Sequence, residues 1–290
     1  MSAPSLAVGH CRSVLERSGS SFASAFRILP RDQRDAMTAF YAFCREVDDA
    51  VDEAPDEESG RRRIGEWRNN VERLYLGDFA NPVCEALGWA VGAFGIRREH
   101  IELVLEGVEQ DLSLSRFETF AELHEYCYRV AGAVGLVCVT VMGAQDMEAD
   151  LYAELTGTAV QLTNIIRDVS EDAGLGRIYL PAEDLRAFGV SEGDILDRRA
   201  TSALCALLGF EAARTRHFYD LAAAALPPRA EGKLFFAEAL RDTYSRLLDR
   251  LVERDLDVFS ERVSLGKFEK IGIALKHRLR VPGRFRTDQP

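Results

Sequence analysis

The sequence predicts an all-α fold with a single domain. Apolar residues recur at helical spacing through most of the 290 residues, and few stretches alternate between apolar and polar as half-buried strands do. Proline, glycine and N-capping residues interrupt this pattern at intervals typical of helix ends. No low-complexity segment, internal repeat or linker divides the chain. One helical bundle covering residues 1–290 is therefore the simplest architecture.

Boundary signals place the helices of the first half of the chain. Pro30 precedes a long amphipathic segment that ends before Pro55, and Gly77 terminates the next segment. Asn81 followed by Pro82 is typical of an N-cap with proline at the first helical position. The predicted helices cover residues 31–54, 57–76, 82–94 and 97–114.

Similar signals place the helices of the second half. Thr119 and Glu122 are spaced as in a capping box, and Ser191 and Thr201 are candidate N-caps. A loop rich in glycine covers residues 173–181, and two prolines at 227–228 separate the last two long helices. The predicted helices cover residues 119–142 and 147–171, a short segment ending at residue 188, and residues 201–225 and 229–261.

Charge and composition exclude several classes of protein. The formal net charge is −11, so nucleic acid is not an expected partner, because chains that bind duplexes usually carry net positive charge. The N-terminus lacks a basic segment followed by an apolar one, and the longest apolar run, residues 130–144, is shorter than the roughly 20 residues of a membrane span. We therefore expect a cytoplasmic protein.

The cysteines and histidines indicate neither disulfides nor a zinc site. The six cysteines are irregularly spaced and form no CxxC pair, which predicts reduced and mostly buried thiols. The five histidines are scattered and form no HExxH pattern. Nucleotide-binding patterns of the GxGxxG and Walker A types are also missing from the sequence.

An acidic stripe lies on the first long helix. Polar residues spaced three or four apart share one face of it: Tyr41, Arg45, Asp48 or Asp49, and Asp52. The rest of the helix is apolar, so these like charges would repel one another and lose hydration. A divalent cation with oxygen ligands would offset that cost, and Arg45 could grip a phosphate. A solvated helix face is the alternative, and the stripe taken alone favours it.

A second polar stripe lies within residues 161–172, QLTNIIRDVSED. Asn164, Asp168 and Asp172 follow one another at intervals of four and therefore line one side of a helix. Gln161 lies one turn before the first of them, and Arg167 precedes the second. All the ligand atoms are hard oxygens, a set that suits Mg²⁺ rather than zinc or copper.

Two such stripes on separate helices favour a shared function. If the helices face a common cavity, their carboxylates can hold about two or three Mg²⁺ ions, which would make a diphosphate a better leaving group. A ferritin-like di-metal bundle is set aside, because no Glu-x-x-His pair is present. The stripes therefore predict a Mg²⁺-dependent enzyme that ionises a diphosphate beside a dry apolar pocket.

Five segments occur in an order that is specific in combination: SSFASAFRILP, YAFCREVDDAVD, EYCYRVAGAVG, QLTNIIRDVSED and GRIYLP. With these segments the chain resembles the squalene/phytoene synthase family of head-to-head prenyl transferases over nearly its whole length. The resemblance implies a class I isoprenoid synthase bundle with a central active-site cavity. Gly132 and Gly135 in the third segment would leave room for a prenyl chain or, alternatively, for a closely packed helix.

The resemblance also implies roles for individual residues. The Mg²⁺ ligands would be Asp48, Asp49, Asp52, Asn164, Asp168 and Asp172. The substrate contacts would be Ser21, Phe22, Tyr41, Arg45, Gln161, Arg167 and Tyr244. Tyr128, chosen over Tyr126 only through the motif, would act at the cyclopropyl intermediate. Ordinary core packing is the alternative for Phe22 and Tyr244.

The implied reaction joins two farnesyl diphosphates into presqualene diphosphate, with or without NADPH-dependent conversion to squalene. The proton lost in that step would go to the released diphosphate or to Tyr128. The opening segment is most similar to the presqualene diphosphate synthases of hopanoid pathways, so downstream pathway enzymes are expected partners. Four alternatives stay open: a phytoene synthase acting on two geranylgeranyl diphosphates, a dehydrosqualene synthase, a cyclase acting on one prenyl diphosphate, and a non-catalytic scaffold.

The C-terminal segment, residues 264–290, is basic in an otherwise acidic chain. Its cations are Lys267, Lys270, Lys276, Arg278, Arg280, Arg284 and Arg286. A peripheral contact with the inner face of a membrane is one interpretation. A frayed and solvated tail is the alternative.

Overall fold

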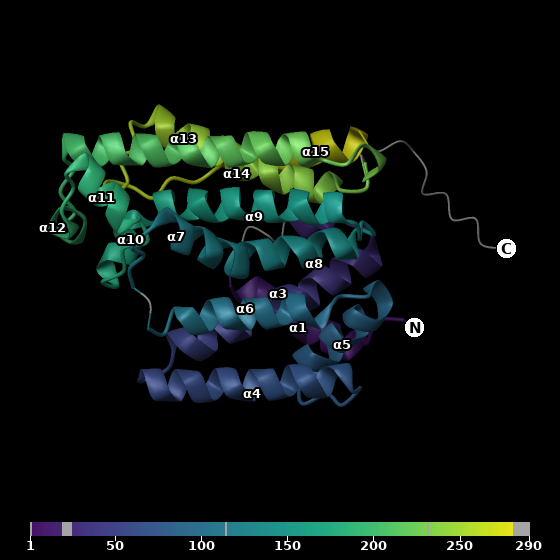
Figure 1. The fold of residues 1–290 in the computed structure, drawn as a ribbon. Coiled ribbons are helices and arrows are strands. Elements are labelled where there is room, and N and C mark those ends of the chain that lie inside the picture. The colour runs from purple at the N-terminus through teal and green to yellow at the C-terminus, as the bar shows by residue number, and fades with distance from the viewer. Residues whose placement is uncertain (1, 19–24, 114, 231, 281–290) are drawn as a thin grey trace.

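The protein is described by a computed structural model that covers residues 2–18, 25–113, 115–230 and 232–280. Within these ranges every regular element is a helix, apart from one isolated bridge between Arg116 and Ile178 (Figure 1). The all-α prediction is therefore confirmed.

The elements follow one another along the chain with short connections. They are α1 (Ser5–Arg17), η1 (Phe26–Ile28), α3 (Arg31–Asp52), α4 (Glu57–Tyr75), α5 (Pro82–Phe94), α6 (Arg98–Gln110), α7 (Phe120–Cys127), η2 (Tyr128–Gly132), α8 (Ala133–Val141), α9 (Met147–Arg167), α10 (Val169–Gly174), α11 (Ala182–Phe188), α12 (Glu192–Leu196), α13 (Ser202–Ala225), η3 (Pro228–Ala230), α14 (Phe235–Glu253) and α15 (Lys267–Arg280).

Local capping chemistry sets several of these ends where the sequence places them. The Asn81 side chain accepts a hydrogen bond from the Cys84 amide at 2.8 Å, and α5 ends at Gly95 with φ +70°. Ser191 forms a capping box at the start of α12, and Thr201 caps α13. These boundaries need only neighbouring residues, which is why the sequence predicts them.

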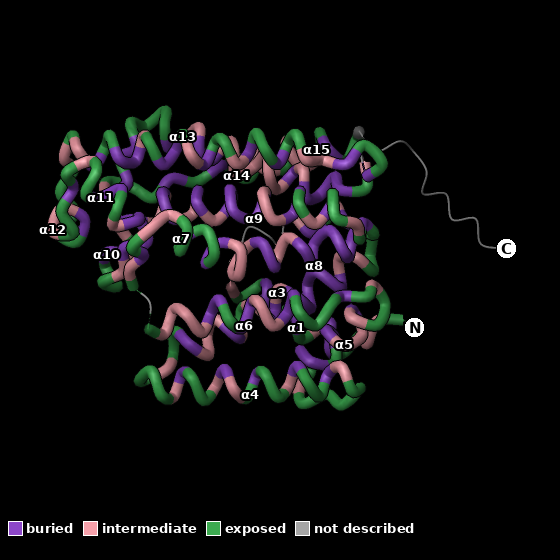
Figure 2. Tube along the Cα trace, in the orientation of Figure 1, coloured by how far each residue is buried: buried purple, intermediate pink, exposed green. Residues whose placement is uncertain are grey.

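Helix α9 lies in the middle of the bundle (Figure 1). It packs against α13 and α14 on one side and against η2 and α8 on the other. Helix α3 packs against α1, α4, α5 and α6 farther from α13. Buried residues run along α8 and α9, where the layers meet (Figure 2).

Glycines let α9 approach η2 and α8 closely. A Cβ added at Gly157 would lie 2.5 Å from the carbonyl oxygen of Ala131, and one added at Gly135 would lie 2.7 Å from the carbonyl oxygen of Ala153. Such distances cannot be accommodated without backbone movement. Close helix packing therefore explains Gly135, although Gly135 and Gly157 also line the central cavity described below.

Three predicted helices are interrupted in the structure. The helix predicted over 119–142 is divided by the π-helical turn η2, at the point where Gly157 crosses Ala131. The helix predicted over 147–171 ends at Arg167, because Asp168 adopts φ −99° and ψ 13°. The helix predicted over 229–261 is confined to Phe235–Glu253, and left-handed backbone follows at residues 255 and 256.

Other predictions need smaller corrections. The helix predicted over 97–114 ends at Gln110, and α1 was not expected. Residues 267–280 form α15, packed against α14, in place of a frayed tail. All six cysteines are free and four of them are buried, as predicted. No helix among the described residues has the length and apolarity needed to cross a bilayer.

Candidate active site

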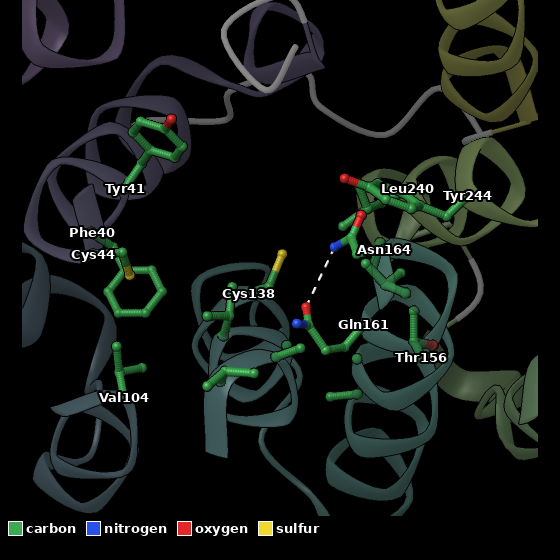
Figure 3. Close-up of a pocket in the computed structure, with 18 of the residues that line it drawn as sticks. Phe40, Tyr41, Cys44, Val104, Cys138, Thr156, Gln161, Asn164, Leu240 and Tyr244 are labelled. Atoms are coloured by element: carbon green, nitrogen blue, oxygen red, sulfur yellow. Dashed lines mark hydrogen bonds between the residues drawn. The ribbon is translucent and has the colours of Figure 1, made fainter. Parts of the chain in front are cut away.

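A central cavity of about 360 Å³ is enclosed by α3, α6, α8, α9 and α14. Its lining changes character along α3 and α6, since apolar residues such as Phe40 and Val104 are followed by Asp48 on α3 and Asp111 after α6. On α9, Gln161 and Asn164 point across the cavity toward α3 (Figure 3). An apolar interior with polar groups gathered at one end suits an amphiphilic ligand.

The α3 wall carries the first acidic stripe. Asp48 lines the cavity, and burial, together with the nearby Asp52 and Asp111, raises the pKa of its carboxyl to about 7. Asp49 instead forms an ion pair with Arg45, one turn earlier, and Asp52 is exposed at the end of the helix. Only one of the three aspartates of this stripe therefore faces the cavity directly.

Tyr41 completes this wall. It lines the cavity, and its hydroxyl donates a hydrogen bond to the Ser18 hydroxyl at 2.9 Å. Ser21 and Phe22, also predicted at the site, lie outside the described residues.

The α9 wall carries the second stripe, and the bend at Asp168 divides it. Asn164 lines the cavity, where its Oδ1 atom is buried and accepts no hydrogen bond from the described residues, while its Nδ2 atom donates to Gln161 at 3.4 Å. Asp172 lies beyond the bend, and burial together with Asp168 raises the pKa of its carboxyl to about 7. A buried acceptor without a donor is costly, so a ligand or cation is expected at Asn164.

Asp168 is held by arginines from two parts of the chain. Arg167 donates to both of its carboxylate oxygens, and Arg262, after α14, approaches Oδ1 at 2.8 Å. Tyr244 of α14 lines the cavity close to Arg167, and burial raises the pKa of its hydroxyl. Arg262 was not predicted, because 94 residues separate it from Asp168 and no local pattern marks it.

Asp111 is a further acid that the sequence reasoning missed. It lines the cavity directly after α6 and accepts hydrogen bonds from the hydroxyls of Tyr126 and Tyr179, both at 3.3 Å. Burial raises the pKa of its carboxyl to about 6 despite these donors. A signal was present, because Asp111 continues the register of the buried residues Ile101, Val104 and Val108.

Two neighbouring tyrosines, Tyr126 and Tyr128, differ in their relation to the cavity. Tyr126 lines the cavity and is almost fully buried, whereas Tyr128 is half-buried and lies outside the cavity lining. Burial and the charge of Glu154 raise the pKa of the Tyr128 hydroxyl, and Arg97 opposes the shift. Residues two apart on a helix point to nearly opposite sides, so both tyrosines cannot face the same cavity.

The polar end of the cavity fits divalent cations only in part. Within the described residues, no group of three or more His, Cys, Asp or Glu side chains is close enough to hold an ion by itself. Asp48 and Asp111, whose carboxyls have raised pKa values, line this end of the cavity, however, and Asn164 offers an unused oxygen. Such a donor set fits Mg²⁺ that also takes ligands from a bound phosphate group, its usual mode in proteins.

Comparisons with known proteins agree with this geometry. The family model for squalene/phytoene synthase matches residues 15–269. The chain is 36% identical to a presqualene diphosphate synthase of Rhodopseudomonas palustris, covering 90% of this chain and 94% of the relative. It is 34% identical to a phytoene synthase of Arthrospira platensis, covering 90% and 89%.

A solved structure agrees as well. A dehydrosqualene synthase in complex with a ligand superposes with a TM-score of 0.82 at 27% identity, covering 95% of this chain and 96% of that one. The chain belongs to the squalene/phytoene synthase family and is, like the members of that family, a prenyltransferase.

Proposed function

We propose that this chain condenses two molecules of farnesyl diphosphate head to head into presqualene diphosphate. The observation that carries the proposal is the apolar cavity with Asp48, Asp111 and Asn164 at one end, which matches a long apolar chain joined to a diphosphate. The choice of the farnesyl chain rests on the 36% identity to a presqualene diphosphate synthase. The product would be passed to later enzymes of an isoprenoid pathway.

Enzymes of this family use a divalent metal to ionise prenyl diphosphates. In this chain the proposed ligands are Asp48, Asp49, Asp52, Asn164, Asp168 and Asp172. Mg²⁺, when bound, would neutralise the diphosphate and make it a better leaving group.

The chain's own residues would position the substrates and exclude water. The walls built from α3, α8 and α14 hold the prenyl chains in an apolar environment, where a carbocation is protected from hydrolysis. Arg45 and Arg167, each beside an acid of its stripe, would contact the diphosphate, together with Tyr41, Gln161 and Tyr244.

The proton that closes the cyclopropane would go to the released diphosphate. The diphosphate is favoured over Tyr128 because Tyr128 is half-buried and lies outside the cavity lining. Tyr126 lines the cavity, but burial raises the pKa of its hydroxyl well above the ordinary value, so it keeps its own proton. We assign to Tyr126 the role of holding Asp111 in place.

The test is incubation of the purified protein with farnesyl diphosphate and Mg²⁺, with and without NADPH, followed by mass spectrometry. Presqualene diphosphate in both reactions is the expected result. Squalene formed only with NADPH would extend the proposal to the second half-reaction. Phytoene formed from geranylgeranyl diphosphate, with no product from the farnesyl substrate, would replace it with the function of the Arthrospira platensis relative.

A pair of variants on α3 links any product to the proposed site. Asp48→Asn should remove product formation, because Asp48 faces the cavity. Glu46→Gln should retain it, because Glu46 lies outside the cavity lining and approaches His10 at 3.6 Å. Equal activity of the two variants would contradict the placement of the site.

A further inference from the structure

The outer face of α15 is not covered by any described part of the chain. Polar contacts hold the opposite, inner face against α14: buried His277 is 2.8 Å from the Asp242 carboxylate, and Glu269 pairs with Arg246 at 3.2 Å. Glu269 also pairs with Arg250 of α14. These contacts fix the rotation of α15 about its axis, and therefore decide which residues it turns outward.

Four large apolar side chains lie in one stripe along that outer face. Phe268 is 92% exposed, Ile271 47%, Leu275 48% and Leu279 83%. Their spacing of three, four and four residues keeps them on one side of a helix. Single exposed apolar residues are common, but four aligned on one helix indicate a surface that meets an apolar partner.

Cations border this stripe. Lys267, Lys276 and Arg278 are exposed on α15, and the helix has one acid, Glu269, which the arginines of α14 neutralise. The whole chain carries a net charge of −11, so the basic character is local to this helix. An apolar stripe flanked by lysine and arginine is complementary to an anionic lipid surface, where the cations reach the headgroups and the stripe enters the apolar layer.

A second cavity lies between this stripe and the candidate active site. It has a volume of about 250 Å³ and lies between α14 and α15, with Ile271 and Leu275 in its wall. Phe236, Leu240 and Tyr244 line both this cavity and the central one. These three side chains therefore form a wall that the two cavities share.

We propose that α15 docks on an anionic lipid bilayer through Phe268, Ile271, Leu275 and Leu279, and that the second cavity opens toward the lipid at this contact. In this orientation, movement of the shared wall of Phe236, Leu240 and Tyr244 would let an apolar chain pass between the bilayer and the central cavity without crossing water. This use of the cavity rests on the proposed function, whereas the docking itself does not.

The test is co-sedimentation with vesicles in the absence of substrate and Mg²⁺. The full chain should bind vesicles of equal parts phosphatidylglycerol and phosphatidylcholine, and should bind pure phosphatidylcholine weakly. A double variant, Phe268→Ser with Leu279→Ser, should lose at least about tenfold in binding, because each buried side chain of this size contributes more than that factor. Neither Phe268 nor Leu279 lines either cavity, so the condensation activity of the double variant should be unchanged.

The matched control is Leu6→Ser, which removes an equally exposed leucine (91%) from α1 and should bind as the parent chain does. Circular dichroism and thermal denaturation establish that each variant is folded. Equal vesicle binding by the double variant and the parent would overturn the proposal. The proposal would also be overturned if light scattering without lipid showed a dimer of the parent chain and a monomer of the double variant, since the stripe would then bind a second copy of the chain.

The outcomes separate this proposal from the proposed function. Condensation activity without vesicle binding would overturn the docking alone. Vesicle binding that depends on the stripe, in a protein that forms no prenyl product, would overturn the proposed function alone.

Discussion

Replacing Asp48 with asparagine should make the ligand-free protein more stable while removing its proposed activity. Asp48 is half-buried at the cavity with other acids nearby, and its carboxyl has a pKa of about 7 instead of the ordinary 3.8. The folded state therefore favours the neutral form. A group whose pKa is raised by folding contributes its full stabilisation below its pKa in the unfolded chain. That contribution is lost as the pH rises through its pKa in the folded state. At pH 8 the Asp48 carboxyl is ionised, and the folded protein carries the full free-energy cost of that charge at the cavity.

The size of the effect follows from that pKa. A difference of about three pKa units corresponds to about 4 kcal/mol at most, at about 1.4 kcal/mol for each unit. Water at the polar end of the cavity screens the charge, and the asparagine amide needs hydrogen bonds of its own, so we expect a gain of about 1–2 kcal/mol. For a chain of this size that corresponds to an increase in melting temperature of ~2–6 °C.

The assay is thermal denaturation at pH 8 of the parent, Asp48→Asn and Asp49→Asn, each with EDTA and then with Mg²⁺ and pyrophosphate. Asp49 is the control, because its carboxylate is paired with Arg45 and replacing it removes an attraction. With EDTA, only Asp48→Asn should be stabilised. With Mg²⁺ and pyrophosphate, the parent should gain more stability than Asp48→Asn. Destabilisation of ligand-free Asp48→Asn would refute the electrostatic reasoning.

Two further predictions concern packing and pH. Gly157→Ala should destabilise the protein by about 1–3 kcal/mol in urea unfolding, because its Cβ would lie 2.5 Å from the Ala131 carbonyl oxygen. Gly209 on α13 has open space around it, so Gly209→Ala should stabilise the protein by about 0.5–1 kcal/mol. An equal loss of stability in the two variants would contradict the close-packing argument. Burial raises the pKa of Glu211 to about 8 although Arg214 opposes the shift, so stability should fall as the pH rises from about 4.5 through 8. Glu211→Gln should flatten that part of the melting-temperature profile, and an unchanged slope would exclude Glu211 as its source.

Local signals in the sequence determined most of the helices. Asn81 with Pro82, Ser191 and Thr201 cap helices through hydrogen bonds to amides two or three residues away, so neighbouring residues suffice to predict them. The breaks inside predicted helices needed the tertiary structure. The turn η2 lies where Gly157 brings another helix close, and the bend at Asp168 involves Arg262 from a distant segment.

The candidate site shows the same division. The two polar stripes were evident because helical spacing alone places the members of each on one face, and an arginine accompanies each stripe. In the structure, Asp48 and Asn164 line the cavity, whereas Asp49 forms an ion pair with Arg45. The packing of the helices therefore decides which residues of each stripe face the cavity. Spacing cannot make that selection, because Asp48 and Asp49 point about 100° apart and only the packing of neighbouring helices decides which direction faces the cavity.

The sequence by itself thus determined the fold class, the helices that carry the acids and the residue types available for chemistry, because these depend on periodicity and short-range hydrogen bonds. The tertiary structure alone decided that Tyr126 lines the cavity while Tyr128 does not, and that α15 turns its apolar stripe outward. Each of these depends on how helices distant in sequence pack together, and packing direction is set by contacts that no single helix contains.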